Sequence, residues 1–460
     1  MNNARNIKHL YARAGFGIRF EDLHDHENWS ANKAVRKLFK ASADSHPITI
    51  LTENIDLRPQ ANKTDEEKIR IQEERNTQDK ALNLAWITQL STTDAQLREK
   101  MTLFWHNHFA CNIGNAYYEQ QLNNIERENA LGNFKTLLLQ VSQSPGMLQF
   151  LNNQQNQKGH PNENFARELM ELFTIGRGNY TEHDVKESAR AFTGWAYDGK
   201  TGDYIFRPKV HDDNPKTFMG QTGNFCGEDI VEIIFSHKKT AEFISTKLYR
   251  YLVNDVPDAE HISQMTNVFY KSNYEIKPLL EFVFQSNWFY DDKNIGNLVK
   301  SPVEFLTGLN RQFYITYQNP DVLMQFQRTL GQLLFRPPNV AGWPGGKSWI
   351  DSSSLMYRMK MSSIILNAGV IDFTGKVDPG DEAYLASVRK QQMNVIKRVQ
   401  AQPNWDKFLK EIPDDTSKIQ IAEFMLEPKL NQAVIAEVNQ ATDIKDTIIQ
   451  IVSTPEYQLC

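Results

Sequence analysis

Apolar residues recur at helical spacing over most of this chain, and that periodicity constrains the fold more than any other feature. The longest run spans residues 81–109, where large apolar side chains share one face of a 3.6-residue repeat. Capping signals at Thr181 and Ser301 mark two further helix starts, the second with a proline at the first helical position. We therefore expect a mostly α protein, a multi-helix orthogonal array with helices over 81–109, 121–142, 162–175, 181–197, 228–235, 238–253, 261–285, 301–318 and 320–335.

Two segments interrupt the helical pattern. Residues 198–227 are rich in Gly, Asp, Asn and Pro, which predicts an irregular loop with a small β-hairpin. Residues 336–346 carry prolines and glycines that a helix does not tolerate. We predict a main helical domain over 1–370, with the loop and hairpin inserted at 198–227, and a C-terminal helical subdomain over 371–460.

Charge and cysteine content exclude several classes of protein. The net charge of −5 argues against a general nucleic-acid partner. Three separated cysteines, Cys111, Cys226 and Cys460, exclude a disulfide scaffold and an all-cysteine zinc site. No apolar run reaches the roughly 18–20 residues of a membrane span, and no secretory signal is visible. We expect a cytoplasmic protein, with a processed envelope form as the alternative.

The predicted helix over 162–175 gathers most of the chemistry. At 100° per residue, its polar side chains fall on one arc of about 140°, opposite an apolar stripe; they are Glu163, Asn164, Arg167, Glu168 and Glu171. One interpretation is a solvated face with Glu163 and Arg167 as an i,i+4 pair. The other is a polar cavity that binds a divalent metal or a polar substrate.

Histidines in two further segments are candidate ligands. His106 and His108 lie about 200° apart on a helix, so they cannot share one ion. His108 follows the buried stripe, where an imidazole is either a paired core residue or bound to an ion or a carboxylate. His211 and Asp212, followed by Lys216, lie in the irregular segment and suit a ligand, a general base and an anion contact, or an ordinary turn.

Nucleotide-binding and hydrolase signatures are absent. There is no phosphate-binding loop, dinucleotide fingerprint, His-Glu-x-x-His or Gly-x-Ser-x-Gly. A series of different motifs lies along the rest of the chain. They are His9–Gly17, Phe104–Phe109, Asn162–Gly176, Tyr180–Val185, Ala189–Trp195, His211–Asp212 with Lys216 and Gly220, Val299–Phe305, Pro337–Val340 with Gly342, Trp343 and Trp349, and Pro455–Tyr457. With these motifs, nearly the whole chain resembles the bacterial family known as domain of unknown function 1800; 42–80 and much of 370–440 match poorly.

This resemblance implies a mostly helical bacterial protein of unassigned activity. Members are often encoded beside a partner resembling the alkaline phosphatase and sulfatase superfamily. The family pattern usually has a histidine where this chain has Phe173, so a ligand at that position would be missing here. The resemblance also implies that the family motif restricts the residue type at several positions of this helix more than a solvent-exposed face requires. These positions are Asn164, Arg167, Glu168 and Glu171.

Two functions follow as hypotheses. The first is a metal-dependent hydrolytic or oxidative enzyme whose polar site lies between helices. Its catalytic residues would be Glu168, Glu171, His211 and Asp212; its substrate contacts Asn164, Arg167, Arg190, Trp195, Lys216, Asn339 and Trp343; and the ligands of a divalent metal His108, Glu168 and His211. The second is a non-catalytic scaffold or partner of an alkaline-phosphatase-like protein, its motif residues forming a structural polar network.

Overall fold

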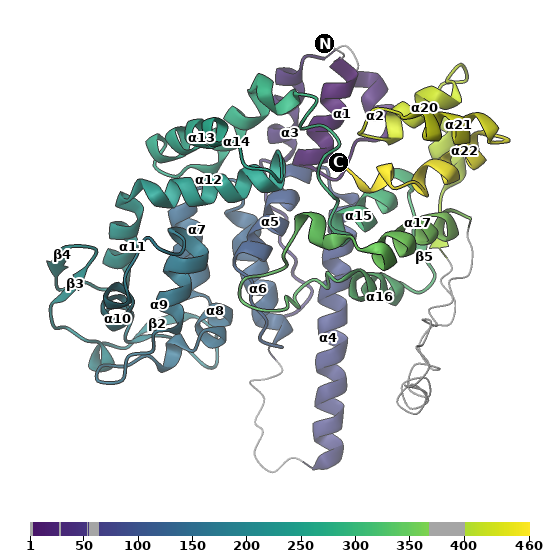
Figure 1. Cartoon of the computed structure of the whole chain (residues 1–460). Coiled ribbons are helices and arrows are strands. Elements are labelled where there is room, and N and C mark those ends of the chain that lie inside the picture. Colours follow the sequence, from purple (N-terminus) through teal and green to yellow (C-terminus); the bar gives the residue numbers. More distant parts are fainter. Residues whose placement is uncertain (1–2, 27–28, 53, 55–63, 368–400) are drawn as a thin grey trace. The chain divides into compact units, whose positions relative to one another are not determined.

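The computed structural model describes residues 3–26, 29–52, 54, 64–367 and 401–460, and in these residues the fold is mostly α, as predicted (Figure 1). The strands in the described ranges form three short antiparallel pairs. They are β1 (Trp195–Tyr197) with β2 (Tyr204–Phe206), β3 (Lys216–Phe218) with β4 (Gln221–Gly223), and β5 (Thr316–Tyr317) with β6 (Ala401–Gln402). The predicted insertion therefore carries two hairpins, the first starting at Trp195.

The chain divides into two compact units, each assembled from separate stretches of sequence. Unit 1 consists of Met1–Trp29, Ile295–Gln332 and Gly345–Cys460, and unit 2 of Ser30–Asn294 and Leu333–Pro344. The predicted domain boundary at residue 370 falls within 368–400, outside the described residues, so that division stays a prediction.

Unit 1 contains α1 (Asn3–Ala14), α2 (Phe20–His26), α15 (Pro302–Phe313), α16 (Asp321–Leu330), α17 (Ser352–Leu366), α19 (Trp405–Lys410), α20 (Lys418–Met425), α21 (Gln432–Gln440) and α22 (Ile444–Val452). The predicted capping box at Ser301 is present, since its hydroxyl accepts from the Glu304 amide and the Glu304 carboxylate accepts from the Ser301 amide.

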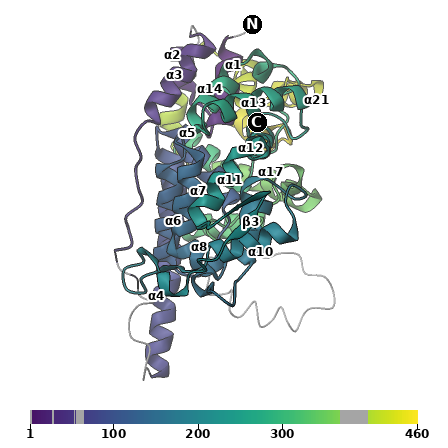
Figure 2. The same ribbon diagram turned by 90° about the vertical axis from the view of Figure 1, so that its left-hand side faces the viewer.

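Unit 2 contains α3 (Ala31–Ala41), α4 (Asp65–Thr92), α5 (Gln96–His108), α6 (Ala116–Glu128), α7 (Phe134–Gln143), α8 (Pro145–Phe150), α9 (Asn164–Glu168), the π-helical turn η3 (Leu169–Thr174), α10 (Glu182–Ala191), α11 (Gly227–Ser236), α12 (Lys238–Leu252), α13 (Ala259–Lys271) and α14 (Ile276–Gln285). Helices α5, α6 and α7 lie side by side (Figure 2). The predicted helix over 81–109 is two helices, because the chain turns after Thr93, whose hydroxyl accepts from the Ala95 amide.

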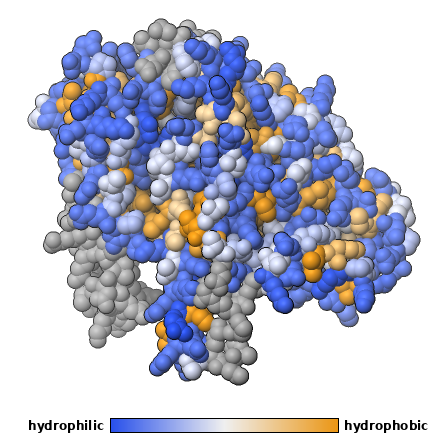
Figure 3. Space-filling view, turned by 180° about the vertical axis from the view of Figure 1, so that it is seen from behind, coloured by the Kyte–Doolittle hydropathy of each residue, from blue (hydrophilic) through white to orange (hydrophobic). Residues whose placement is uncertain are grey.

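No described helix meets the length and apolarity that a membrane crossing needs. On the face shown in Figure 3, apolar side chains form small islands among polar ones.

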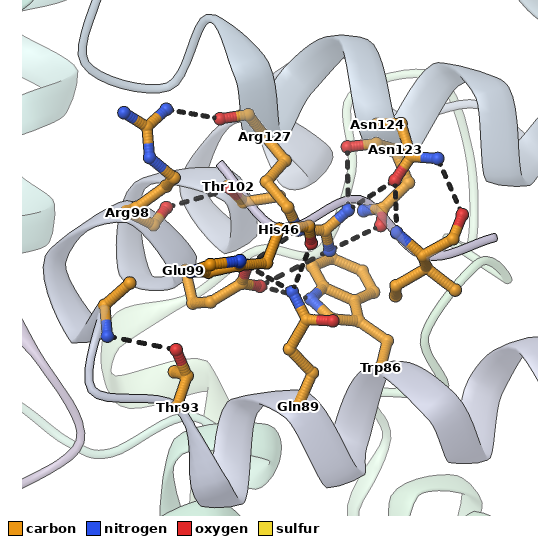
Figure 4. Close-up of polar contacts among 12 residues, drawn as sticks. His46, Trp86, Gln89, Thr93, Arg98, Glu99, Thr102, Asn123, Asn124 and Arg127 are labelled. Carbon is orange, nitrogen blue, oxygen red and sulfur yellow. Dashed lines mark hydrogen bonds and ion pairs between the residues drawn. The ribbon is translucent and has the colours of Figure 1, made fainter. Parts of the chain in front are cut away.

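A buried ionic cluster joins α4, α5 and α6 around the carboxylate of Glu99 (Figure 4). Arg127 donates to it through Nε at 2.6 Å and through a terminal nitrogen at 3.3 Å. The indole of Trp86 donates to it at 2.9 Å and the amide of Gln89 at 2.8 Å. Arg127 and Glu99 are almost fully buried, so each depends on the other for its charge to be tolerated inside the unit.

We predict that Arg127→Met destabilises the protein by about 3–5 kcal/mol, because it leaves the Glu99 carboxylate buried without its cation. Urea unfolding followed by circular dichroism measures the change. The matched control is Lys68→Met, which breaks the exposed Lys68–Asp65 pair on α4 and should leave the unfolding free energy unchanged within error. Equal effects from the two substitutions would contradict the assigned role of the cluster.

Candidate functional site

The predicted helix over 162–175 runs from Asn164 to Thr174, and its second half is π-helical. The amides of Ile175 and Gly176 both reach back to the Met170 carbonyl, at 3.2 and 2.9 Å. A π turn is rare and is found frequently at functional sites. At this helix end, the carbonyls of Leu172 and Phe173 bond to side chains from other segments.

Those two carbonyls accept from His108 and Lys247. The His108 Nε2 lies 3.1 Å from the Phe173 oxygen, and because a carbonyl only accepts, Nε2 carries the proton. The unprotonated Nδ1 then accepts from the Lys247 ammonium at 3.1 Å, which also donates to the Leu172 oxygen at 3.0 Å. Basic groups at the carbonyl end of a helix are favourable for its dipole.

Burial lowers the pKa of both groups. The pKa of His108 falls well below its ordinary value, first through burial and then through the charge of Lys247. Burial alone lowers the pKa of Lys247 to about 8. The sequence left two alternatives for His108, a paired core residue or a group bound to an ion or a carboxylate; its partners in the structure are a carbonyl and an amine. Phe173 stands where the family pattern usually has histidine. Its ring is buried, and the centroids of the Phe173 and His108 rings are 6.1 Å apart.

Lys247 is the residue that sequence reasoning missed. It belongs to no motif, and its partner His108 lies 139 positions away. The available signal was its position at the edge of the apolar stripe of α12, three residues after the buried Ile244 and beside the buried Leu248. A lysine at such a position either extends to solvent or finds a buried partner.

Most of the polar side chains predicted to share one arc of this helix form ion pairs or hydrogen bonds. Arg167 forms the expected i,i+4 pair with Glu163 at 3.1 Å and also binds Glu182 at 2.7 Å. Glu171 accepts from the Tyr180 hydroxyl at 2.8 Å and pairs with Arg177. The Asn164 side chain is exposed at the start of α9.

Glu168 differs from its neighbours on the arc. It is partly buried and makes no hydrogen bond or ion pair with any residue that the structure describes. Burial and the nearby charge of Glu171 raise the pKa of Glu168. This carboxyl group is therefore the member of the arc with coordination capacity left.

The second predicted cluster is assembled around Arg190 at the end of α10. Its Nε lies 2.8 Å from Asp212, and a terminal nitrogen lies 2.9 Å from Glu187. Burial would raise the pKa of Asp212, but hydrogen bonds from Arg190 and from the Asn214 amide outweigh it and lower that pKa to about 2. Lys216 is buried and donates to the carbonyls of Asp212 and Asn214.

His211 is held in place by Thr193, which lies 18 positions earlier in the chain. Its Nδ1 lies 2.8 Å from the Thr193 carbonyl, so Nδ1 carries the proton. The Thr193 hydroxyl accepts from the Asp212 amide, also at 2.8 Å. The Nε2 of His211 has no hydrogen-bond partner among the described residues, which leaves its lone pair available. Trp195 is buried nearby against Phe192.

A third group of predicted site residues lies where α5 contacts residues 333–344. The Nε2 of His106 accepts from the Phe335 amide at 3.2 Å. Asn107 bonds both main-chain groups of Trp343, accepting at 2.7 Å and donating at 3.3 Å. Asn339 shapes the turn between them, because its side-chain oxygen accepts from the Ala341 amide at 2.9 Å. These residues hold a loop in place.

The predicted site residues thus lie in several separate clusters of unit 2. In the part of the chain that the structure describes, no group of three or more His, Cys, Asp or Glu side chains is placed to hold a metal ion. The predicted ligands His108, Glu168 and His211 are accordingly not assembled into one site, and each has its own surroundings. Sequence spacing places residues on helix faces but does not say which faces meet.

The comparisons with known proteins agree with the resemblance read from the motifs. The family model described as "Protein of unknown function (DUF1800)" matches residues 9–459. No curated protein and no solved structure matches the chain.

We predict that Gly342→Ala destabilises the protein strongly. Gly342 has φ +79°, and a Cβ there would lie 2.3 Å from Oδ1 and 2.4 Å from the carbonyl oxygen of Asn107. Gly178→Ala is the matched control, because Gly178 has φ +85° with open space around it. Both variants bear a backbone cost of about 1 kcal/mol, and the clash adds about 1–3 kcal/mol to Gly342→Ala alone. Thermal unfolding of the two variants compares them; equal losses would contradict the close contact.

Proposed function

The chain belongs to the DUF1800 family, and we propose that it is a non-catalytic scaffold whose polar motifs hold its non-helical segments in fixed positions for a protein partner. The supporting observation is where the motif residues direct their polar atoms. Lys216, His211 and Asn107 bond mainly to backbone groups of loops, not to one common point. Polar groups spent in this way stabilise a conformation and are not free for a substrate.

The first hairpin offers the surface that this scaffold would present. On β2, Ile205 and Phe206 are 38% and 44% exposed, although both are large apolar side chains. The hairpin is held from behind, since the Arg207 amide donates to the Gly194 carbonyl at 2.8 Å and the Phe206 ring packs on His211. An exposed apolar pair on a rigid support costs little entropy to bind. The family resemblance implies a partner similar to the alkaline phosphatase and sulfatase superfamily.

We predict that Ile205→Ser with Phe206→Ser weakens binding to such a purified partner by about tenfold or more, because apolar anchors dominate interface affinity. Isothermal titration calorimetry measures the dissociation constant. Val256→Ser is the control, since Val256 is 70% exposed elsewhere in unit 2. Loss of affinity in the control as well, or no loss in the hairpin variant, would count against this surface.

The metal-dependent enzyme remains a second candidate because two groups keep coordination capacity. These are the Glu168 carboxyl group and the Nε2 of His211, neither of which has a hydrogen-bond partner among the described residues. In this second proposal, a divalent ion bound at one of these groups would supply the Lewis acid for a hydrolytic or oxidative reaction.

Elemental analysis of protein purified without added metal decides between the two. The scaffold proposal predicts less than one equivalent of any transition metal, unchanged in Glu168→Ala. One equivalent of a metal that Glu168→Ala or His211→Ala removes, in protein still folded by circular dichroism, would overturn the scaffold proposal in favour of the enzyme. Asn164→Ala, one turn before Glu168 on α9 and exposed to solvent, is the control and should retain whatever metal the wild type holds.

A further inference from the structure

Lys247, His108 and the Phe173 carbonyl form a line of three groups joined by hydrogen bonds. The amine lies 3.1 Å from Nδ1 of the imidazole, and the opposite nitrogen lies 3.1 Å from the carbonyl oxygen. This is the order of a nucleophile, a base within hydrogen-bond reach and a third group that orients the base. The carbonyl fixes the tautomer, so the free lone pair of His108 faces the amine.

The amine has the surroundings of a nucleophile instead of a structural cation. Its contacts are the Leu172 carbonyl, the His108 ring and the face of Phe243, 4.8 Å away. Within the described ranges, no carboxylate pairs with it. Its side chain is of intermediate solvent exposure. Burial lowers the pKa of Lys247 to about 8, which leaves about a tenth of the amine neutral at pH 7.

We propose that Lys247 binds a small uncharged aldehyde or ketone covalently as an imine, with His108 as the proton acceptor and donor. The neutral amine attacks the carbonyl carbon, so that a C–N bond forms as the C=O π bond breaks. His108 accepts one proton from the attacking nitrogen and passes it to the carbonyl oxygen, which gives a carbinolamine. The second N–H proton then moves through His108 to the hydroxyl group, which leaves as water as the C=N bond forms. One carbonyl compound and one amine thus give one imine and one water, with no oxidant or reductant.

The groups around the amine favour this reaction over acyl transfer. An acyl transfer develops a negative oxygen that needs hydrogen-bond donors, whereas the two groups bonded to the Lys247 amine are acceptors, the Leu172 carbonyl oxygen and Nδ1 of His108. When the imine takes up a proton from water it becomes a cation with an N–H, which can donate to the Leu172 carbonyl as the ammonium does. It also keeps the favourable position at the negative end of the helix dipole.

This site does not depend on the scaffold proposal. It uses α5, α12 and η3, whereas the proposed partner surface lies on β2. Binding of a carbonyl compound and binding of a protein partner are measured separately, so the failure of one leaves the other standing.

The test is competitive reductive alkylation of the folded wild-type chain. Propanal at low concentration with sodium cyanoborohydride converts each imine into a stable propyl amine, and peptide mapping by mass spectrometry gives the rate at each lysine. Lys239 is the internal reference, because it lies on the same helix, is 57% exposed and pairs with Glu242. An ordinary lysine is neutral in roughly four of ten thousand molecules at pH 7. Allowing for the weaker nucleophilicity of a less basic amine, we expect Lys247 to react about tenfold faster or more.

His108→Asn tests the proton relay. We expect this variant to slow alkylation at Lys247 at least about threefold while leaving Lys239 unchanged; an unchanged rate at Lys247 would remove His108 from the proposal. If the variant does not fold, the wild-type chain still decides, because its preference for Lys247 must disappear in urea. Alkylation of Lys247 no faster than Lys239 in the folded chain overturns the proposal outright.

Discussion

The end of α5 is the point on which the arrangement of unit 2 depends. Four consecutive buried or nearly buried side chains there, Trp105 to His108, each bond a different segment. Trp105 donates to the Ala130 carbonyl, His106 accepts from the Phe335 amide, Asn107 bonds both main-chain groups of Trp343, and His108 meets the π-helical turn. Because a buried polar atom without a partner costs about 1–3 kcal/mol, these four residues specify where loops far apart in sequence must lie.

The same constraint explains why the polar motifs need not mark one active site. Arg190, Lys216 and Thr193 lie in the family-like motifs, yet each bonds neighbouring backbone or an opposite charge. The Glu99–Arg127 cluster does the same deeper inside the unit. Lys247 is the exception, since its partners among the described residues are an imidazole, a carbonyl and an aromatic face. Chemistry is expected where a polar group is left with capacity, and not simply where polar groups are many.

Local physics carried much of the prediction. The capping boxes at Thr181 and Ser301 and the Glu163–Arg167 pair depend on residues three or four apart, and all three are present. Two features were not predicted, and both are local changes in helix geometry. Helix 81–109 divides at Thr93 because a short-range hydroxyl bond ends the turn, and the π-helical turn at Leu169–Thr174 widens a helix that periodicity describes as regular. Sequence spacing does not show either change, because an apolar stripe continues through both.

The sequence alone determined the helical class, the helix faces, the family and the list of polar residues that have to be paired, since these depend on composition and on contacts within a turn or two. Only the tertiary structure decided the partners. His108 meets Lys247 across 139 positions and Asn107 meets Trp343 across 236. A hydrogen bond is short-ranged and directional, so which two side chains form one depends on how helices pack, and no local pattern in either segment records that.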